Sequence, residues 1–449
     1  MSTRESFASK FGVLVAMAGS AVGLGNLWRF PYLVGTNGGA AFIIIYLACV
    51  LLLALPIMYS EFVIGRRSRA NVFGAYKVLA PNTKWCNVGF IYLLCSLTII
   101  SFYSVVGGWT IDYLFKAITF KFEVVDTSLL NGMFTSAVTS EYEPLFYMLI
   151  FLVATALIVL AGVKEGIEKY TKIMMPVLFI MVVVIAIRSV TLPGASAGLD
   201  FLFKPDFSKV TATTFLEALG QAFFSLSVGA GTVMTYASYV NKKESIVGLS
   251  TQTALTDTLF AVIAGLAIMP AVFAFGVSPE QGPGLVFVTL PYIFSQLPFG
   301  SVLAIIFFFI LFIAALTSSI SLLEVIVAYL NEEYKLSRMK SITISLIVVV
   351  ILGALCSLSQ GVLSDIKIFG NNIFDCFDKL SANILLPLGG LIAVIFVGWR
   401  MKKGDFTDEF TSGGVYKYSP ALMSFFYFSI KYLAPIVVAV IMIRGLYCH

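Results

Sequence analysis

Long runs of apolar residues, repeated along nearly the whole chain, constrain this sequence more than any other feature. Of its 449 residues, 59% are hydrophobic and only 12% are charged. A soluble domain needs more polar surface than this, whereas a lipid bilayer tolerates the balance. Only helices and closed barrels cross lipid, because every backbone N–H and C=O must be satisfied within the protein. The runs are long and do not alternate with period two, so we expect helices.

Hydropathy predicts eleven membrane-spanning helices. They lie near residues 11–35, 39–65, 86–116, 145–162, 167–188, 212–239, 246–275, 301–330, 341–360, 373–399 and 421–447. A loop marked by Gly and Pro at 276–300 separates the seventh from the eighth and is a candidate for short helices. The polar start MSTRESFASKFG lacks a cleavage pattern, so no removable signal peptide is expected.

Lys and Arg residues predict the orientation of the chain. One set of connections carries 19 of them and the other set carries 7. The richer set is cytoplasmic by the positive-inside rule. The N-terminus is therefore expected in the cytoplasm and the C-terminus outside, in a multi-pass protein of the plasma membrane. The net charge of +5 reflects the same bias and does not indicate nucleic acid.

Cysteine and histidine offer no catalytic or metal-binding pattern. The six cysteines show no CxxC or metal spacing and are interpreted as small apolar packing residues. They are Cys49, Cys86, Cys95, Cys356, Cys376 and Cys448. The one histidine, His449, is the last residue, so no Ser–His, Cys–His or zinc site can be assembled and the chain is not expected to be an enzyme.

Two pairs of glycines interrupt predicted helices at matching positions. The first helix carries SAVGLGN at 20–26, and the sixth carries SLSVGAG at 225–231. Glycine is a poor helix former and permits unusual φ/ψ, so we expect both helices to unwind in mid-membrane. Unwound backbone at that depth is tolerated only around a protein-lined cavity. Close packing of small residues is the alternative for one break, and two matching breaks weigh against it.

The spacing of the breaks indicates a transporter. They lie five helices apart, so the two halves enter the membrane from opposite sides, as in the inverted repeats of secondary transporters. The freed N–H groups of a broken helix suit a carboxylate, and its freed carbonyls suit a small cation such as sodium. Asn26, Ser225, Thr317 and Ser318 supply further neutral oxygen within otherwise apolar helices.

Ionisable residues within predicted helices are costly in lipid and mark functional positions. They are Arg29, Asp257, Asp375 and Asp378, whereas Glu61 and Glu324 lie near cytoplasmic ends and are read as capping or pairing groups. Arg29 needs a counter-charge, and Asp378 is the candidate because both lie toward the outer side. A surface ion pair at the membrane boundary is the alternative.

The sequence resembles the neurotransmitter:sodium symporter family over essentially its whole length. The resemblance rests on GSAVGLGNLWRFPYLVGTNGGAAF at 19–42, GQAFFSLSVGAGTVMTYASY at 220–239 and LTSSI at 316–320. It implies an all-α integral membrane protein of five plus five helices in inverted repeat, with helices one and six unwound and an eleventh helix added. The expected division is an N-terminal segment at 1–10, a first repeat at 11–190, an extracellular loop at 191–211, a second repeat at 212–400, and a loop with helix eleven at 401–449.

The resemblance also implies two sodium sites beside one substrate site. The first would use the Ala21 carbonyl, Asn26, Ser225, Asp257 and the substrate carboxylate, and the second the carbonyls of Gly19, Val22 and Ala314 with the hydroxyls of Thr317 and Ser318. The substrate positions are Ser20, Ala21, Gly23, Gly25, Ile99, Tyr103, Val106, Phe224, Ser225, Ser227, Ala230, Ser318 and Leu322. Tyr103 is the tyrosine implied to bond the substrate carboxylate.

The resemblance also implies an outer gate, an inner gate and a helix that can unwind. The outer gate would be Arg29, Asp378 and Phe224, and the inner gate Arg4, Phe7, Tyr239 and Glu332. Phe7 replaces the usual tryptophan, so we expect a less firm inner closure. Gly166 and Pro176 match a spacing that lets helix five unwind and admit water to the second sodium, and a proline in mid-span fits that role.

Departures from the family pattern narrow the function. Asp257 stands where members that need chloride commonly carry asparagine, and Ala261 lacks a hydroxyl that the chloride site uses, although Tyr46, Ser225 and Gln221 resemble the rest of it. A fixed carboxylate can compensate sodium in place of chloride. Gly23 stands where monoamine carriers hold the amine with aspartate, so the substrate is expected to be an amino acid. Ala230 leaves room for a large neutral side chain, aromatic or branched aliphatic.

Sodium-coupled import of a neutral L-amino acid by alternating access is the function these features favour. A proton-coupled or exchange carrier of the same architecture remains an alternative, because a buried Asp257 could titrate. A channel needs a continuous polar lining, and only a few polar positions converge here.

Overall fold

The computed structural model describes residues 6–122, 127–276 and 285–447, and the described residues form an all-helical bundle. They contain no strand, only an isolated bridge between Ile368 and Asn371. Arg4, Cys448 and His449 lie outside the described residues. The all-helical prediction is thereby confirmed.

The first half of the chain contains the first five predicted spans. Its elements are α1 (Lys10–Ala21), η1 (Gly25–Arg29), α2 (Phe30–Thr36), α3 (Ala40–Cys49), η2 (Val50–Ala54), α4 (Leu55–Ser68), α5 (Val72–Leu79), η3 (Lys84–Val88), α6 (Gly89–Ile118), α7 (Thr127–Thr139), α8 (Glu143–Leu160), η4 (Val163–Glu168) and α9 (Lys169–Val190). Side-chain oxygens of Ser9 and Asn71 accept backbone N–H groups at the starts of α1 and α5, which fixes where these helices begin.

The second half of the chain begins with a loop that carries two short helices, α10 (Ala195–Phe203) and η5 (Phe207–Lys209). Its elements are α10 (Ala195–Phe203), η5 (Phe207–Lys209), α11 (Ala212–Ser225), α12 (Thr232–Ala237), α13 (Ile246–Ala274), η6 (Leu285–Thr289), α14 (Leu290–Ser295), α15 (Gly300–Glu333), α16 (Arg338–Leu358), α17 (Ile373–Leu380), η7 (Ser381–Leu385), α18 (Leu386–Ile395), η8 (Phe396–Arg400), α19 (Lys403–Phe410), α20 (Pro420–Phe428), η9 (Ser429–Leu433) and α21 (Ala434–Tyr447). The short helices η6 and α14 lie in the loop that the sequence marked at 276–300.

Nine helices of the described part are long and apolar enough to cross a membrane. The pair Lys10–Ala21 and Gly25–Thr36 would make a tenth, bent by 44° at its break. The remaining predicted span, 212–239, is divided between α11 and α12, neither of which is long enough alone. The predicted spans are therefore all helical, and the first and sixth are interrupted.

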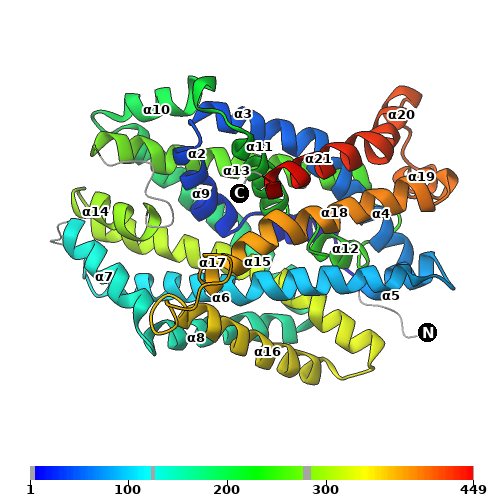
Figure 1. Cartoon of the computed structure of the whole chain (residues 1–449), viewed down its shortest axis with the longest axis horizontal. Coiled ribbons are helices and arrows are strands. Elements are labelled where there is room, and N and C mark those ends of the chain that lie inside the picture. Colours follow the sequence, from blue (N-terminus) through cyan, green and yellow to red (C-terminus); the bar gives the residue numbers. More distant parts are fainter. Residues whose placement is uncertain (1–5, 123–126, 277–284, 448–449) are drawn as a thin grey trace.

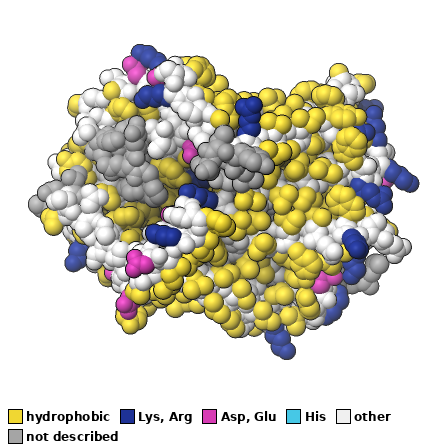
Figure 2. All heavy atoms as spheres, viewed as in Figure 1, with side chains coloured by type: hydrophobic (Ala, Val, Ile, Leu, Met, Phe, Trp, Pro, Cys, Tyr) yellow, Lys and Arg dark blue, Asp and Glu magenta, His cyan; other side chains and the backbone are white. Residues whose placement is uncertain are grey.

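The interrupted helices lie inside the bundle. The two longest helices, α6 and α15, pack against each other across the middle of the molecule, with α8 and α16 along them (Figure 1). α1 packs against α9, α13 and α15. Hydrophobic side chains cover most of the middle of the face in Figure 2, and several Lys and Arg side chains gather at the right-hand end, where α5 and α19 lie. That distribution suits a helical bundle surrounded by lipid.

Candidate substrate and ion site

The break in the first span leaves backbone groups that neighbouring helices satisfy. The Gly23 N–H donates to Asn26 Oδ1 (3.1 Å), and the Leu24 N–H donates to the Tyr103 hydroxyl on α6 (3.2 Å). A Cβ atom at Gly23 would lie 2.2 Å from Ser318 Oγ and 2.9 Å from the Tyr103 hydroxyl. Position 23 therefore has no space for a side chain, because α6 and α15 close on its backbone.

The break in the sixth span depends on residues with positive φ. Ser227, Gly229 and Gly231 have φ values of 54°, 83° and 82°, a region that glycine adopts without steric cost. The Ala230 carbonyl accepts the Ser96 hydroxyl of α6 (2.7 Å). A Cβ at Gly229 would come within 2.0 Å of the Leu386 carbonyl. The unwound turn is thus held between α6 and the start of α18.

Ser20 joins the two breaks directly. Its carbonyl accepts the hydroxyl of Ser227 from the second break (2.8 Å) and the hydroxyl of Ser318 from α15 (3.3 Å). Its own hydroxyl donates to Ser321 (2.8 Å). Carbonyls and hydroxyls of three helices therefore converge at one buried point.

A small cavity lies between the breaks. It is lined by Ser20, Ala21, Gly23, Gly25, Ile99, Tyr103, Phe224, Ser227, Ala230, Ser318, Leu322 and Leu386, and its volume is about 20 Å³. Of the predicted substrate positions, Val106 and Ser225 are buried but do not line it. A volume of this size holds about one water molecule, so the walls must separate before an amino acid can enter.

Leu386 is the wall residue that sequence reasoning missed. The sequence assigned extra room to the cavity because position 230 is alanine. Leu386, at the start of α18, lines the same cavity from another helix. The space beside Ala230 therefore depends on Leu386 as well as on Ala230 itself, and these two residues lie far apart in the chain.

A buried carboxylate lies directly beside the first break. Asp257 Oδ1 accepts the Asn26 amide (2.8 Å), and Ser225 Oγ lies 2.9 and 2.8 Å from its two oxygens. The Tyr46 hydroxyl donates to Asp257 Oδ2 (3.3 Å). Asn26, Ser225, Asp257 and Tyr46 are all fully buried.

The Asp257 cluster has the composition of a site for a hard cation. Its donors are neutral, and among the described residues no Lys or Arg forms an ion pair with Asp257. A buried carboxylate without a cation is costly. The described residues also contain no group of three His, Cys, Asp or Glu that could hold a transition metal. Oxygen ligands of this kind suit alkali and alkaline-earth ions.

Three members of the second predicted sodium set lie close together, while the Ser318 hydroxyl donates to the Ser20 carbonyl instead. Thr317 Oγ1 lies 3.4 Å from the Val22 carbonyl and 3.0 Å from the Ala314 carbonyl. Gly19 faces α9, since a Cβ there would touch Met175 and Thr171 at 3.4 Å. α1, α9 and α15 therefore meet around this group of oxygens.

The residues of the predicted outer gate lie close together. Arg29 Nε lies 3.9 Å from Asp378 Oδ1, and the guanidinium carbon lies 5.5 Å from the centroid of the Phe224 ring. Arg29 also donates to Gln221 Oε1 (3.0 Å), and Gln221 donates to the Gly25 carbonyl (2.7 Å). Arg29 is buried, whereas the Asp378 side chain keeps 22% of its exposure.

The predicted inner gate is packed with aromatic rings. Phe7 is buried, with its ring 5.9 Å from Tyr236 and 6.3 Å from Tyr239, and its N–H donates to the Tyr239 carbonyl (3.2 Å). Glu332 accepts the side-chain amide of Asn71 (3.0 Å). Arg4 lies outside the described residues, so the structure describes no contact for it.

Helix five is not unwound in this structure. Gly166 lies in the π-helical turn Val163–Glu168, and α9 continues through Pro176. Glu168 accepts the Ser9 hydroxyl (2.9 Å) and the Ala8 N–H (2.6 Å), which ties the start of the chain to this turn. A Cβ at Gly12 would fall 1.9 Å from the Glu168 carboxylate.

Two glutamates interpreted from the sequence as capping or pairing groups are fully buried. Glu61 is fully buried and accepts the Gly229 N–H of the second break (2.8 Å). Glu324 pairs with Arg338 (2.6 Å) and accepts the Tyr239 hydroxyl (2.8 Å). Glu324 therefore forms an ion pair, which is one of the two roles that the sequence suggested for it. Glu61 instead stabilises the unwound turn.

Two interrupted helices that face each other across a buried cavity, inside a bundle of membrane-length helices, define a secondary transporter. Comparisons with known proteins agree. The pattern of the sodium:neurotransmitter symporter family matches residues 4–129 and 133–448. The chain therefore belongs to this family of transporters, is not an enzyme, and is a multi-pass membrane protein.

Individual relatives support the same assignment. The chain is 38% identical to the uncharacterized sodium-dependent transporter YhdH of Bacillus subtilis (strain 168), covering 98% of this chain and 97% of that protein. It is 26% identical to the sodium-dependent dopamine transporter of Bos taurus over 90% of this chain and 64% of that protein. The crystal structure of MhsT in complex with L-phenylalanine superposes with a TM-score of 0.93 at 42% identity, covering 98% of this chain and 100% of that one. The predicted fold, with helices one and six unwound, is confirmed.

Proposed function

We propose that the protein imports a large neutral L-amino acid together with sodium. The observation that carries this proposal is the buried Asp257 carboxylate, which has only neutral donors and lies beside the unwound segment of helix one. A sodium ion there would neutralise Asp257 and be coordinated by Asn26 and Ser225. The substrate carboxylate would complete the same site, so that each ligand strengthens binding of the other.

A second sodium ion would bind between α1 and α15. The carbonyls of Gly19, Val22 and Ala314 and the hydroxyls of Thr317 and Ser318 are its proposed ligands. The contact of Gly19 with α9 supports this assignment, because movement of α9 would change the site and open a route for the ion toward the cytoplasm. Two sodium ions per substrate is the stoichiometry that we expect.

The substrate class is supported by two features of the cavity. Position 23 has no space for the aspartate that would hold a monoamine, so the substrate must supply the carboxylate itself. The remaining walls, among them Ile99, Phe224, Ala230 and Leu322, are apolar. The bound L-phenylalanine of the MhsT structure agrees with an aromatic or branched aliphatic amino acid.

Chloride is not required in this proposal. The hydroxyls of Tyr46 and Ser225, which resemble chloride ligands, bond to the Asp257 carboxylate instead. The fixed charge therefore occupies the place where an anion would compensate sodium. Replacement of chloride by gluconate should leave uptake unchanged, and a collapse of uptake would contradict this part of the proposal.

Transport would proceed by alternating access. Sodium binds from outside and favours the outward-open state, and substrate then closes Phe224 and the Arg29–Asp378 pair over the cavity. Loosening of helix five releases the second sodium inward, and substrate follows. Each shift depends on the different affinity of the ligands for the two states. The proposed orientation places the N-terminus in the cytoplasm and the C-terminus outside.

Uptake into proteoliposomes tests the coupling and the substrate together. Labelled L-phenylalanine should accumulate under an imposed sodium gradient, and competition with all twenty amino acids should rank large neutral ones first. A proton-coupled carrier would instead accumulate substrate under a pH gradient without sodium. An exchange carrier would require amino acid preloaded inside and would ignore both gradients.

A further inference from the structure

An open pocket at the end of the molecule that carries α19 is not explained by transport. Its volume is about 550 Å³, far more than the about 10–15 Å³ that one water molecule needs. It lies between α19, the loop that follows it and the first turns of α20. Its lining includes Lys403, Lys417, Thr407, Thr411 and Tyr427.

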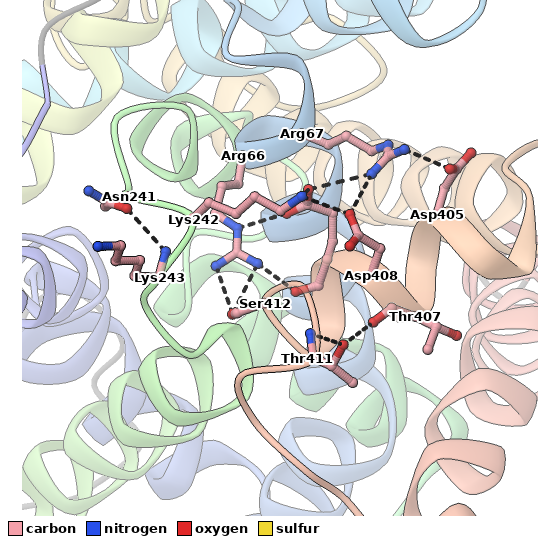
Figure 3. Close-up of polar contacts among 12 residues, drawn as sticks. Arg66, Arg67, Asn241, Lys242, Lys243, Asp405, Thr407, Asp408, Thr411 and Ser412 are labelled. Atoms are coloured by element: carbon pink, nitrogen blue, oxygen red, sulfur yellow. Dashed lines mark hydrogen bonds and ion pairs between the residues drawn. The ribbon is translucent and has the colours of Figure 1, made fainter.

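The acidic residues of α19 point away from this pocket. Asp405 and Asp408 pair with Arg67 of α4 at 2.6 and 3.2 Å, and Glu409 pairs with Arg66 at 2.8 Å (Figure 3). None of the three acids lines the pocket, whereas Lys403, Thr407 and Thr411 do. One face of α19 is thus occupied by an ion-pair network, and the opposite face presents the Lys403 ammonium group, while the hydroxyls of Thr407 and Thr411 donate to backbone carbonyls of the same helix.

The lysines around the pocket have no described counter-charge. Lys403 Nζ lies 5.3 Å and Lys431 Nζ 5.9 Å from the centroid of the Tyr427 ring. Among the described residues, Lys403, Lys417 and Lys431 form no ion pair with a carboxylate. Lys403 and Lys417 both line the pocket, so an anion bound there would meet positive charge that no described carboxylate compensates. The pocket therefore favours an anionic ligand.

The surroundings of the pocket identify the ligand as a lipid. α20 and α21 form the span Pro420–Arg444, and only 22% of its 18-residue apolar stretch is buried within the protein. Beside the pocket this span exposes Phe425, Phe428 and Tyr432 by 50%, 55% and 41%. Tyr and Trp with nearby basic residues are typical of the membrane–water interface, where basic pockets bind anionic headgroups. An acyl chain can continue from such a headgroup along the exposed face of α20.

We propose that this pocket binds the phosphate headgroup of an anionic phospholipid of the cytoplasmic leaflet. Lys403 and Lys417 contact the phosphate, and the acyl chains lie on α20. The opposite face of α19 contacts α4 and, through Lys242–Asp408 (2.8 Å), the loop between α12 and α13. The bound lipid therefore stabilises the position of α19, the helix that contacts the cytoplasmic end of the sixth span.

Lipid binding by the purified protein in neutral detergent tests this proposal without measuring transport. Fluorescent short-chain phosphatidylglycerol should bind more tightly than phosphatidylcholine. Each basic residue near an anionic headgroup contributes about fivefold to affinity, so K403Q/K417Q should weaken phosphatidylglycerol binding by roughly 30-fold. Phosphatidylcholine binding should stay unchanged. The matched control K84Q/K340Q removes two exposed lysines elsewhere in the described chain and should bind phosphatidylglycerol as the wild type does.

A charge-preserving variant separates binding from folding. K403R/K417R should retain phosphatidylglycerol binding, and loss in this variant as well as in K403Q/K417Q would assign the lysines a packing role and overturn the proposal. Equal binding of both lipids would overturn it too. Glycerol phosphate that competes as well as phosphatidylglycerol would reveal a site for a free anion instead of a lipid. Dimers that form in the wild type and disappear in K403Q/K417Q would assign the pocket to a second copy of the chain.

Discussion

Gly23 faces the cavity with its backbone alone, and one added methyl group would reach both Ser318 and Tyr103. Gly23→Ala should therefore weaken binding of L-phenylalanine at least tenfold, about 1.4 kcal/mol, because its Cβ would lie 2.2 Å from Ser318 Oγ. Equilibrium binding of labelled phenylalanine in detergent measures this. Gly132→Ala on α7 is the matched control, since no heavy atom lies within 4 Å of its added Cβ. Unchanged affinity in Gly23→Ala would show that substrate binds elsewhere.

Asp257 contributes the only formal charge of its hydrogen-bonded cluster. Asp257→Asn keeps the shape of the side chain and removes that charge, so sodium affinity should fall at least tenfold in chloride-free buffer. Sodium-dependent thermal stabilisation provides the measurement. Asp206→Asn changes a carboxylate at the start of η5 and should leave the sodium titration as in the wild type. Equal titrations for both variants would remove Asp257 from the sodium site.

Individual residues were predictable from sequence to different extents. Asn26, Ser225 and Asp257 stand out as polar residues in apolar surroundings, and the resemblance to the family implied that they belong to one site. Leu386 carries no such signal, because a leucine that lines a cavity and one that faces lipid have the same local sequence. Glu61 was visible as a charge, but its bond to Gly229 depends on how α4 packs against the break.

The unwound turn of the sixth span is stabilised by contacts with other helices. Its positive φ angles, the Glu61 carboxylate and the α6 hydroxyl of Ser96 all support it. Glycine pairs predicted that the turn exists, since regular helix is disfavoured there. Its exact path could not be predicted, because the partners of its Gly229 N–H and Ala230 C=O groups come from α4 and α6, and α18 packs closely against Gly229.

Gly229→Ala tests that element. The added Cβ would meet the Leu386 carbonyl at 2.0 Å, and alanine at a φ of 83° is strained. We expect the free energy of unfolding to decrease by about 2 kcal/mol or more, together with loss of substrate binding. Gly404→Ala, where nothing lies within 4 Å, should melt as the wild type does. A Gly229→Ala protein with unchanged melting temperature would show that the turn does not need glycine.

Across the whole molecule, the small cavity is closed from both sides. Arg29, Asp378 and Phe224 lie on one side, and Phe7, Tyr236 and Tyr239 on the other. In the proposed mechanism these two groups of residues separate in turn. The helices and their breaks were predictable from the sequence because they depend on local composition. The closed arrangement depends on how the helices pack, which no local pattern determines.

Asp378→Ala removes one half of the outer closure without touching either proposed sodium site. The Arg29–Asp378 pair spans 3.9 Å and is partly exposed, so it is worth about 1 kcal/mol or less. Sodium-driven uptake should therefore fall about two- to fivefold, because the outward-open state is no longer disfavoured as strongly once substrate has bound. Sodium binding in detergent should stay within twofold of the wild type, and Asp375→Ala on the same helix should change neither quantity. Joint loss of uptake and sodium binding in Asp378→Ala would instead mean that the pair stabilises the fold, since only a change confined to uptake separates a gate from a structural contact.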